Sequence, residues 1–342
     1  MPASSSTPVR DLLTLRDLLR WAISRFNAAG LVYGHGTHTA LDEAAFIILE
    51  SLNLPIDQLE PFLDARLLQD ERKRIVDLIE MRISTRKPAS YLLKKAYVGS
   101  EPFYVDERVI VPRSFIGELL RTDHFAGGPG SLVPDPFAVS SVLDLCTGSG
   151  CLAILAAKHF QAALVDAVDL SEAALEVAQI NVKASGQEGR INLLHGDLFK
   201  PLKGRRYDLI ITNPPYVGEE VMSELSPEFA AEPAMALAGG GDGLDIVRRL
   251  ILEAPDYLEV GGGMICEIGE DREILESDFP DLPFLWLDTE QSEGEVFWIS
   301  AADLGVKAPQ RAAGKTPTPR SLSTARGAAS AATSKARRPT RR

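Results

Sequence analysis

Apolar residues in the first part of the chain recur at steps of three and four, which is the spacing of one helix face. The first such run consists of Leu12, Leu15, Leu19, Ile23 and Phe26. A second helix is predicted to begin at Thr39, which with Asp42 resembles a capping box, and to stop before Pro55. A third is predicted at about 70–84. We therefore expect residues 1–88 to form a small helical domain.

After Pro88 the pattern changes to two runs of β type, 91–98 and 103–111, separated by a turn sequence that starts at Gly99. This arrangement predicts a strand, a turn and a second strand. We expect residues 89–111 to form a β-hairpin that bridges the helical domain and a larger domain.

From residue 141 onward, short apolar runs alternate with longer amphipathic runs. Apolar runs of this length predict buried parallel strands. We predict strands at 142–145, 163–168, 191–194, 209–212 and 263–268, helices at 151–159, 173–183 and 243–253, and two final strands at 284–287 and 295–300. The serial order predicts an α/β fold over residues 112–304, with a doubly wound, mostly parallel sheet that ends in an antiparallel pair.

The composition is that of a globular protein from a reducing compartment. The chain has 342 residues, of which 45% are hydrophobic and 25% charged. Its three cysteines, Cys146, Cys151 and Cys266, are too few and too scattered for a disulfide framework or a zinc site, so we expect no metal. We find no run long enough to span a membrane and no signal-peptide pattern. We therefore expect a cytoplasmic protein with no membrane partner.

The net charge of -12 is distributed unevenly along the chain. Residues 305–342 contain ten Lys or Arg and no Asp or Glu, which leaves a net charge of -22 for residues 1–304. An acidic body does not suit a protein that grips a long nucleic-acid duplex with its folded surface. The tail has almost no large apolar side chains, so we predict that residues 305–342 are disordered.

A glycine turn follows the strand expected at 142–145. Gly148 and Gly150 allow a tight turn and a close approach of the backbone to a ligand at the start of a helix. Asp169 ends the next strand 19 residues after Gly150, where a carboxylate can accept from the two hydroxyls of a ribose. The pattern predicts a nucleoside or nucleotide ligand, and a nicotinamide dinucleotide would use the same residues.

Two further carboxylates favour one kind of ligand. Asp144 lies just before the glycine turn, where a negative charge is unfavourable beside a pyrophosphate but suits the ammonium group of an amino acid. Asp197 follows the strand at 191–194 and could accept from the exocyclic amine of adenine, or could merely cap the next turn. Together they favour a nucleoside that carries an amino acid, which is S-adenosylmethionine.

The strand at 209–212 ends in the sequence Asn213-Pro214-Pro215-Tyr216. Proline cannot continue a strand ladder, so the chain leaves the sheet at Asn213, and the two prolines preset the directions of the backbone carbonyls. The Asn213 side-chain oxygen and the Pro214 carbonyl then form a pair of acceptors beside the face of Tyr216. Such a group suits a planar NH2. A rigid loop exit is the simpler interpretation of the same four residues.

These two motifs, 144–150 and 213–216, resemble those of the protein glutamine N5-methyltransferases, which modify release factors or a ribosomal protein. Further stretches resemble the branch that acts on the third protein of the large ribosomal subunit, namely 16–21, 34–37 with 41–45, and 105–108 with 111–114. The resemblance covers about residues 10–304. The basic tail departs from the family pattern, and only its charge suggests a non-specific contact with ribosomal RNA.

The resemblance implies a Rossmann-like class I methyltransferase domain that uses S-adenosylmethionine to methylate a glutamine side-chain amide. It also implies that the helical domain recognises a large-subunit ribosomal protein as the substrate. The residues expected to bind the cofactor are Asp144, Cys146, Thr147, Gly148, Ser149, Gly150, Asp169, Asp197, Leu198 and Asn213. The residues expected to hold and orient the substrate amide are Asn213, Pro214, Pro215 and Tyr216.

Three other functions remain open from the sequence. The first is the release-factor enzyme of the same family, which only the N-terminal region argues against. The second is a DNA adenine N6-methyltransferase, because adenine also offers a planar NH2, although the acidic body argues against it. The third is a non-catalytic ribosome-assembly protein, which would need only the helical domain and the tail.

Overall fold

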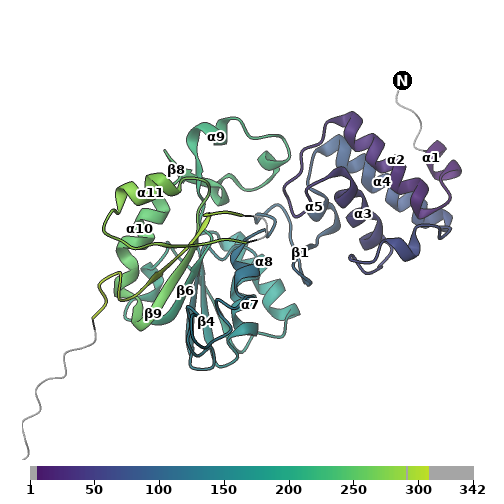
Figure 1. The fold of residues 1–342 in the computed structure, drawn as a ribbon. Helices are drawn as coiled ribbons and strands as arrows, with labels where there is room; N and C mark the ends of the chain where they lie inside the picture. Colours follow the sequence, from purple (N-terminus) through teal and green to yellow (C-terminus); the bar gives the residue numbers. More distant parts are fainter. Residues whose placement is uncertain (1–5, 290–291, 308–342) are drawn as a thin grey trace, which may run out of the picture. The chain divides into compact units, whose positions relative to one another are not determined.

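The computed structural model describes residues 6–289 and 292–307, and the part up to residue 307 forms one compact unit (Figure 1). From residue 308 onward, the tail that we predict to be disordered lies outside the described residues. Among the helices of the described part, none combines the length and the apolar character that crossing a membrane requires.

The N-terminal part is helical, as predicted. Its elements are α1 Ser6–Asp11, α2 Leu15–Ala29, α3 Ala40–Ser51, the short turn η1 Glu60–Phe62 and α4 Gln69–Thr85. The three predicted helices are confirmed, and α1 is additional. Helices α2, α3 and α4 pack around a shared core to which Leu18, Ile48 and Ile79 contribute fully buried side chains. Thr39 caps α3 by accepting a hydrogen bond from the Asp42 N–H at 3.1 Å.

The hairpin that follows is shorter than predicted. Helix α5 Ala89–Leu93 occupies the start of the first predicted strand, and the paired strands are only β1 Ala96–Val98 and β2 Glu101–Phe103. The predicted extension of the second strand to residue 111 is wrong. Val109 is buried, and its carbonyl accepts from the Tyr91 hydroxyl at 2.5 Å. The apolar side chains of this stretch are therefore buried by packing, not by pairing with another strand.

A seven-stranded sheet forms the centre of the second part of the described chain (Figure 1). Its order is β10-β11-β9-β6-β3-β4-β5, and β11 runs opposite to the other strands. The strands are β3 Ser141–Leu145, β4 Leu164–Asp169, β5 Ile191–His195, β6 Tyr207–Thr212, β9 Leu258–Glu267, β10 Leu285–Leu287 and β11 Val296–Ser300. The predicted doubly wound, mostly parallel sheet with a final antiparallel pair is confirmed.

The order of the strands reverses at β3, because β4 pairs with one of its edges and β6 with the other. At such a switch point the following loops diverge and leave a crevice at the carboxyl ends of the strands. Leu145 at the end of β3 lies opposite Thr212 at the end of β6. The glycine turn and the Asn213 motif therefore leave the sheet side by side.

Helices cover both faces of the sheet, and alternate side chains of β3 separate two cores. Val142 packs in one cluster with Ile154 of α7, whereas Leu143 packs in the other with Leu250 of α10. The helices and turns around the sheet are α6 Ile116–Leu119, α7 Cys151–His159, α8 Glu172–Ala184, η2 Lys200–Leu202, α10 Asp245–Glu253, η5 Ala254–Asp256 and α11 Arg272–Asp278. The predicted helices at 151–159, 173–183 and 243–253 are thus confirmed within two residues.

The segment between β6 and α10 carries elements that the sequence pattern does not predict. Strand β7 Val217–Gly218 pairs in parallel with β8 Ala238–Gly240. Helix α9 Glu219–Ser223 and the turns η3 Phe229–Ala231 and η4 Ala234–Ala236 lie between these strands in the chain. This segment leaves the Asn213 motif and returns beside it.

Candidate active site

A cavity of about 360 Å³ opens at the carboxyl ends of the central strands. Its size lies within the range of about 300–1,000 Å³ that is usual for small-molecule sites. The wall is largely apolar, with Val109, Ala174 and Ile246 among its residues. The predicted residues that line it are Cys146, Gly148, Asp169, Asp197, Leu198, Asn213 and Pro215.

The other predicted cofactor residues lie behind this wall: Asp144, Thr147, Ser149 and Gly150 are buried and do not line the cavity. One oxygen of the Asp144 carboxylate accepts from the Thr147 hydroxyl at 2.5 Å and from the Ala153 N–H at 3.0 Å. Burial raises the pKa of Asp144 to about 7. Asp144 therefore ties the glycine turn to the start of α7, and its contact with an ammonium group stays a prediction.

Asp169 ties the end of β4 to the glycine turn. Its two carboxylate oxygens accept from the Gly148 N–H and from the Ser171 N–H, both at 2.8 Å. Burial raises the pKa of Asp169. Each oxygen keeps further lone pairs, so a carboxylate in the cavity wall can also accept from two hydroxyl groups, as the sequence predicts for a ribose.

Two residues of the cavity wall have left-handed backbone conformations although they are not glycine. Cys146 has a φ of 57° and Leu198 a φ of 48°. Such conformations are unfavourable for L side chains and concentrate at functional sites. Leu198 directly follows Asp197, whose carboxylate is held by Lys200 at 2.6 Å and by Arg249 at 3.1 Å. The hydrogen bond from Lys200 lowers the pKa of Asp197 most, and that from Arg249 adds to the effect. Asp197 is therefore an ionised acceptor.

The Asn213 motif is held by Glu267, the last residue of β9. The Asn213 side-chain NH2 donates to Glu267 Oε1 at 3.0 Å, and the Tyr216 hydroxyl lies 3.4 Å from the same oxygen. The other oxygen accepts from the Ser114 hydroxyl at 2.6 Å and from the Phe115 N–H at 2.9 Å. Because the NH2 of Asn213 faces Glu267, its carbonyl oxygen remains available as an acceptor.

Glu267 is the main residue of this site that the sequence interpretation missed. Its side chain is 1% exposed, and burial raises its pKa to about 7. The sequence offers one sign of it, an acidic residue inside the otherwise apolar run 264–268, but its place beside the motif comes from the pairing of β9 with β6. A buried carboxylate at a strand end needs donors, and Asn213 and Tyr216 are two of them.

A second missed feature is the glycine run at 239–243. A Cβ on Gly239 would lie 2.7 Å from Tyr216 Cα, and one on Gly243 would lie 2.3 Å from the Tyr216 carbonyl oxygen. Any larger residue would displace the motif. The two glycines therefore allow β8 and the turn after it to pack directly against the backbone of Tyr216.

Pro214 is buried, whereas Pro215 faces the cavity. The motif therefore presents Asn213 and Pro215 to the cavity and turns Tyr216 toward Glu267. The described residues contain no cluster of three or more potential metal ligands.

The switch-point cavity, the glycine turn linked to an acidic strand end and the Asn-Pro-Pro-Tyr exit define a Rossmann-like methyltransferase. In agreement, residues 132–260 match the family described as "Methyltransferase small domain". S-adenosylmethionine is the cofactor of this class of enzyme, so the predicted fold class, enzyme class and cofactor are confirmed.

Curated relatives identify the family within that class. The chain is 59% identical over 296 residues to the ribosomal protein uL3 glutamine methyltransferase of Bradyrhizobium diazoefficiens, covering 86% of this chain and 92% of the relative. Proteins of the same name from Burkholderia pseudomallei and Bordetella pertussis are 52% and 50% identical, over 88% and 86% of this chain and 98% and 97% of their own length. The chain belongs to the family of ribosomal protein uL3 glutamine methyltransferases.

Proposed function

We propose that this protein transfers a methyl group from S-adenosylmethionine to the side-chain amide nitrogen of a glutamine in ribosomal protein uL3. The assignment of the substrate rests on the high sequence identity to relatives that are named for this activity, over nearly the full length of those relatives. The hydrogen-bonded set of Asn213, Tyr216 and Glu267 supports the reaction type, because it leaves an amide acceptor free at the cavity wall.

The cavity suits the methyl donor by its size and by the chemistry of its wall. Asp169 offers carboxylate lone pairs for a ribose, and Asp197 offers an acceptor for an amine of the base. The backbone at Gly148 lies in the wall without a Cβ, which allows close approach of a ligand. Asp144 would act through the turn that it holds.

When bound, S-adenosylmethionine supplies a methyl group attached to a positively charged sulfur. An amide nitrogen is a poor nucleophile, because its lone pair is delocalised into the carbonyl. We propose that Asn213 Oδ1 and the Pro214 carbonyl each accept one amide hydrogen, while Pro215 fixes the loop and the Tyr216 ring lies beside the amide. Positioning of this kind accelerates transfer, and the same acceptors stabilise the positive charge that develops on the nitrogen. The nitrogen then releases one proton to water.

The named relatives favour this function over a release-factor enzyme. The net charge of -22 for residues 1–304 argues against DNA as the substrate. We further propose that residues 1–88 recognise the ribosomal protein, that 89–111 bridge to the methyltransferase domain at 112–304, and that the tail contacts ribosomal RNA non-specifically. Cytoplasmic localisation follows from this proposal, because the substrate is made and assembled with ribosomes.

Incubation of the purified protein with labelled S-adenosylmethionine and purified uL3 tests the proposal. We expect label in uL3, and a mass increase of one CH2 group on a peptide that contains glutamine. Release factor and DNA serve as competing substrates in parallel reactions. Label in either of these, with none in uL3, would reject the substrate. No transfer to any of the three would favour a binding protein.

A further inference from the structure

The segment between the Asn213 motif and β8 contains two buried carboxylates. Glu228 is 0% exposed and Glu232 is 4% exposed, although both lie in a stretch with only short turns. Isolated buried charges are strongly unfavourable, so each must be held by specific partners. Those partners come from other parts of the chain.

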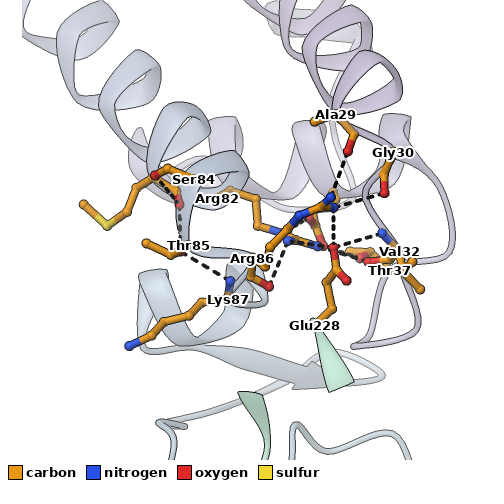
Figure 2. Close-up of polar contacts among 12 residues, drawn as sticks. Ala29, Gly30, Val32, Thr37, Arg82, Ser84, Thr85, Arg86, Lys87 and Glu228 are labelled. Carbon is orange, nitrogen blue, oxygen red and sulfur yellow. Dashed lines mark hydrogen bonds and ion pairs between the residues drawn. The ribbon is translucent and has the colours of Figure 1, made fainter. Parts of the chain in front are cut away.

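Glu228 is held by the helical N-terminal part, as Figure 2 shows. Its Oε1 accepts from Arg86 Nη1 at 2.9 Å and from the Val32 N–H at 3.2 Å. Arg82 Nη1 lies 3.7 Å from the same oxygen. Arg86 also donates to the carbonyl oxygens of Ala29 and Gly30 (Figure 2). The carboxylate thus enters a group of donors at the ends of α2 and α4.

Arg82 extends this group to a second carboxylate. Its side chain is fully buried and donates to Glu43 Oε1 at 2.5 Å and to the carbonyl oxygens of Val32 and Arg86, both at 3.1 Å. The Thr37 hydroxyl donates to the other oxygen of Glu43 at 3.0 Å. Glu43 and Glu228 are therefore both buried next to Arg82, but only Glu228 belongs to the segment that follows the motif.

Glu232 is held by the stretch that follows the hairpin. Arg113 donates to its two oxygens at 2.7 and 2.8 Å, and the Val111 N–H donates at 2.8 Å. A two-fold contact of this kind fixes direction as well as distance. The segment that contains Glu228 and Glu232 is thus bound at two points, on two different parts of the chain.

An aromatic contact lies between these two points. The Phe229 ring packs on the buried His35 ring, with 4.3 Å between the centroids. Gly34 has a φ of 129°, and a Cβ there would lie 2.8 Å from the Phe229 ring. Burial lowers the pKa of His35 to about 4, so the ring is neutral at physiological pH and packs as an uncharged group. His35 therefore contributes an uncharged ring to this contact.

The residues that follow Glu232 form part of the cavity wall: Pro233, Met235, Ala236 and Ala238 line it. We infer that Glu228 and Glu232 are positioning residues for the methyl-donor cavity, and that the helical N-terminal part thereby supports the cofactor site. This inference rests on the proposed function only in that the cavity holds the methyl donor. Coupling of this kind is reciprocal, so binding in the cavity must also stabilise the contacts of Glu228.

Calorimetry of S-adenosylmethionine binding to the full chain tests the first half of the inference. Glu228→Gln removes the charge that binds Arg86 and the Val32 N–H. We expect the dissociation constant of S-adenosylmethionine to be about tenfold higher in this variant than in the wild type. The matched control is Glu43→Gln, which removes an equally buried partner of Arg82 outside the segment. We expect the control to lower the melting temperature but to bind the cofactor as the wild type does. Equal losses in both variants would mean general destabilisation and would overturn the inference, as would unchanged binding in Glu228→Gln.

Two further measurements keep the test decisive. If Glu228→Gln does not fold, Arg86→Gln weakens the same contact from a partly exposed position, and we expect a smaller loss of affinity in the same direction. Hydrogen exchange tests reciprocity: S-adenosylhomocysteine should slow exchange of the Val32 amide in the wild type and not in Arg86→Gln. Unchanged exchange at Val32 in the wild type would overturn the inference. A wild type that binds neither compound would instead reject the proposed function.

Discussion

The side-chain NH2 of Asn213 donates to Glu267 across 3.0 Å, although the two residues are 54 positions apart in the sequence. Strands β6 and β9 are parallel neighbours, and Thr212 pairs with Cys266, so the next residues on the two chain segments, Asn213 and Glu267, lie side by side. The bond sets the orientation of the Asn213 amide. Its NH2 is bound to Glu267, and its oxygen remains available as an acceptor at the cavity wall.

Replacing Asn213 by alanine removes this acceptor, and it also leaves Glu267 with one donor fewer. The acceptor matters most when the substrate nitrogen becomes positive. By analogy with lost oxyanion-hole donors, we expect the rate of methyl transfer to fall about 10²- to 10³-fold. Cofactor affinity should fall much less. Single-turnover rates at saturating cofactor measure the effect, and a rate near that of the wild type would leave the motif only the role of a rigid loop exit.

Asn213→Asp separates acceptance from orientation. The variant keeps an acceptor of the same shape but places a second carboxylate against Glu267. Two carboxylates at this distance share a proton, so one pKa of the pair rises strongly. We expect activity to be low above pH 7 and to recover as the pH falls and the pair becomes protonated. A variant as active as the wild type at high pH would show that the bond to Glu267 has no part in orienting residue 213.

The ionisation of Glu267 predicts a pH dependence of the wild-type rate. Burial raises its pKa to about 7, and the neighbouring Ser114 and Arg113 oppose that rise while Glu295 adds to it. The ionised form is the stronger acceptor for Asn213, so the transfer rate should increase as the pH rises through about 7. Glu267→Gln should be slower and should lose this dependence. Asp144 has a similar pKa and still titrates in this variant. If the rate of Glu267→Gln keeps the same pH dependence, that dependence belongs to another group and not to Glu267.

The raised pKa of Glu267 also makes the stability of the fold depend on pH, and here a rise in pH is unfavourable. The folded state binds a proton at Glu267 more tightly than the unfolded chain does, because the ordinary pKa of a glutamate is 4.5. The contribution of this group to the free energy of unfolding is therefore fully present below pH 4.5 and is lost as the pH rises to about 7. Denaturant titrations of the wild type and Glu267→Gln over this range measure it. If the free energy of unfolding changed with pH in the same way in both proteins, the raised pKa of Glu267 would be contradicted.

The sheet and its helices could be predicted because their signals are local. Each buried parallel strand is a short apolar run, and each of the first turns is marked by glycine, proline or an acid at the strand end, as at Gly148 and Asp169. The position of the cavity followed from the order of strands and helices. Residues 103–111 show the limit of such signals, because burial by packing and burial by pairing give the same pattern of apolar residues.

The residues that hold the site together could not be predicted in the same way. Glu267 lies inside an apolar run and Glu228 in a polar stretch, and in both cases only the fold shows that the carboxylate is buried against partners far away in the chain. The same holds for Asp144, which lies in the predicted motif but faces the turn and α7 instead of the cavity. Long-range pairing decides which carboxylates bind ligand and which support the structure.

Strand β4 carries two carboxylates, Asp169 in the cavity wall and Asp166 outside it, which form a matched pair for mutation. Asp169→Ala removes the proposed ribose acceptor, whose charge-assisted hydrogen bonds contribute roughly 1.5–3 kcal/mol each. Cofactor binding should weaken at least about tenfold, which is about 1.4 kcal/mol. Asp166 lies on the same strand but pairs with Arg205 and Tyr207 and does not line the cavity. Asp166→Ala should therefore retain cofactor affinity, and calorimetry that finds both variants equal to the wild type would remove Asp169 from the site.

The basic tail gives the last prediction. Residues 305–342 carry ten Lys or Arg without an acidic residue, whereas the rest of the chain is acidic. Neutralising phosphates releases counterions, so binding to ribosomal RNA through the tail should weaken steeply with salt. Removing residues 308–342, which follow the described part of the chain, should flatten that salt dependence while transfer to isolated uL3 stays near the wild-type rate. A folded truncation that binds RNA with the same salt slope, or that no longer methylates the isolated protein, would contradict this role.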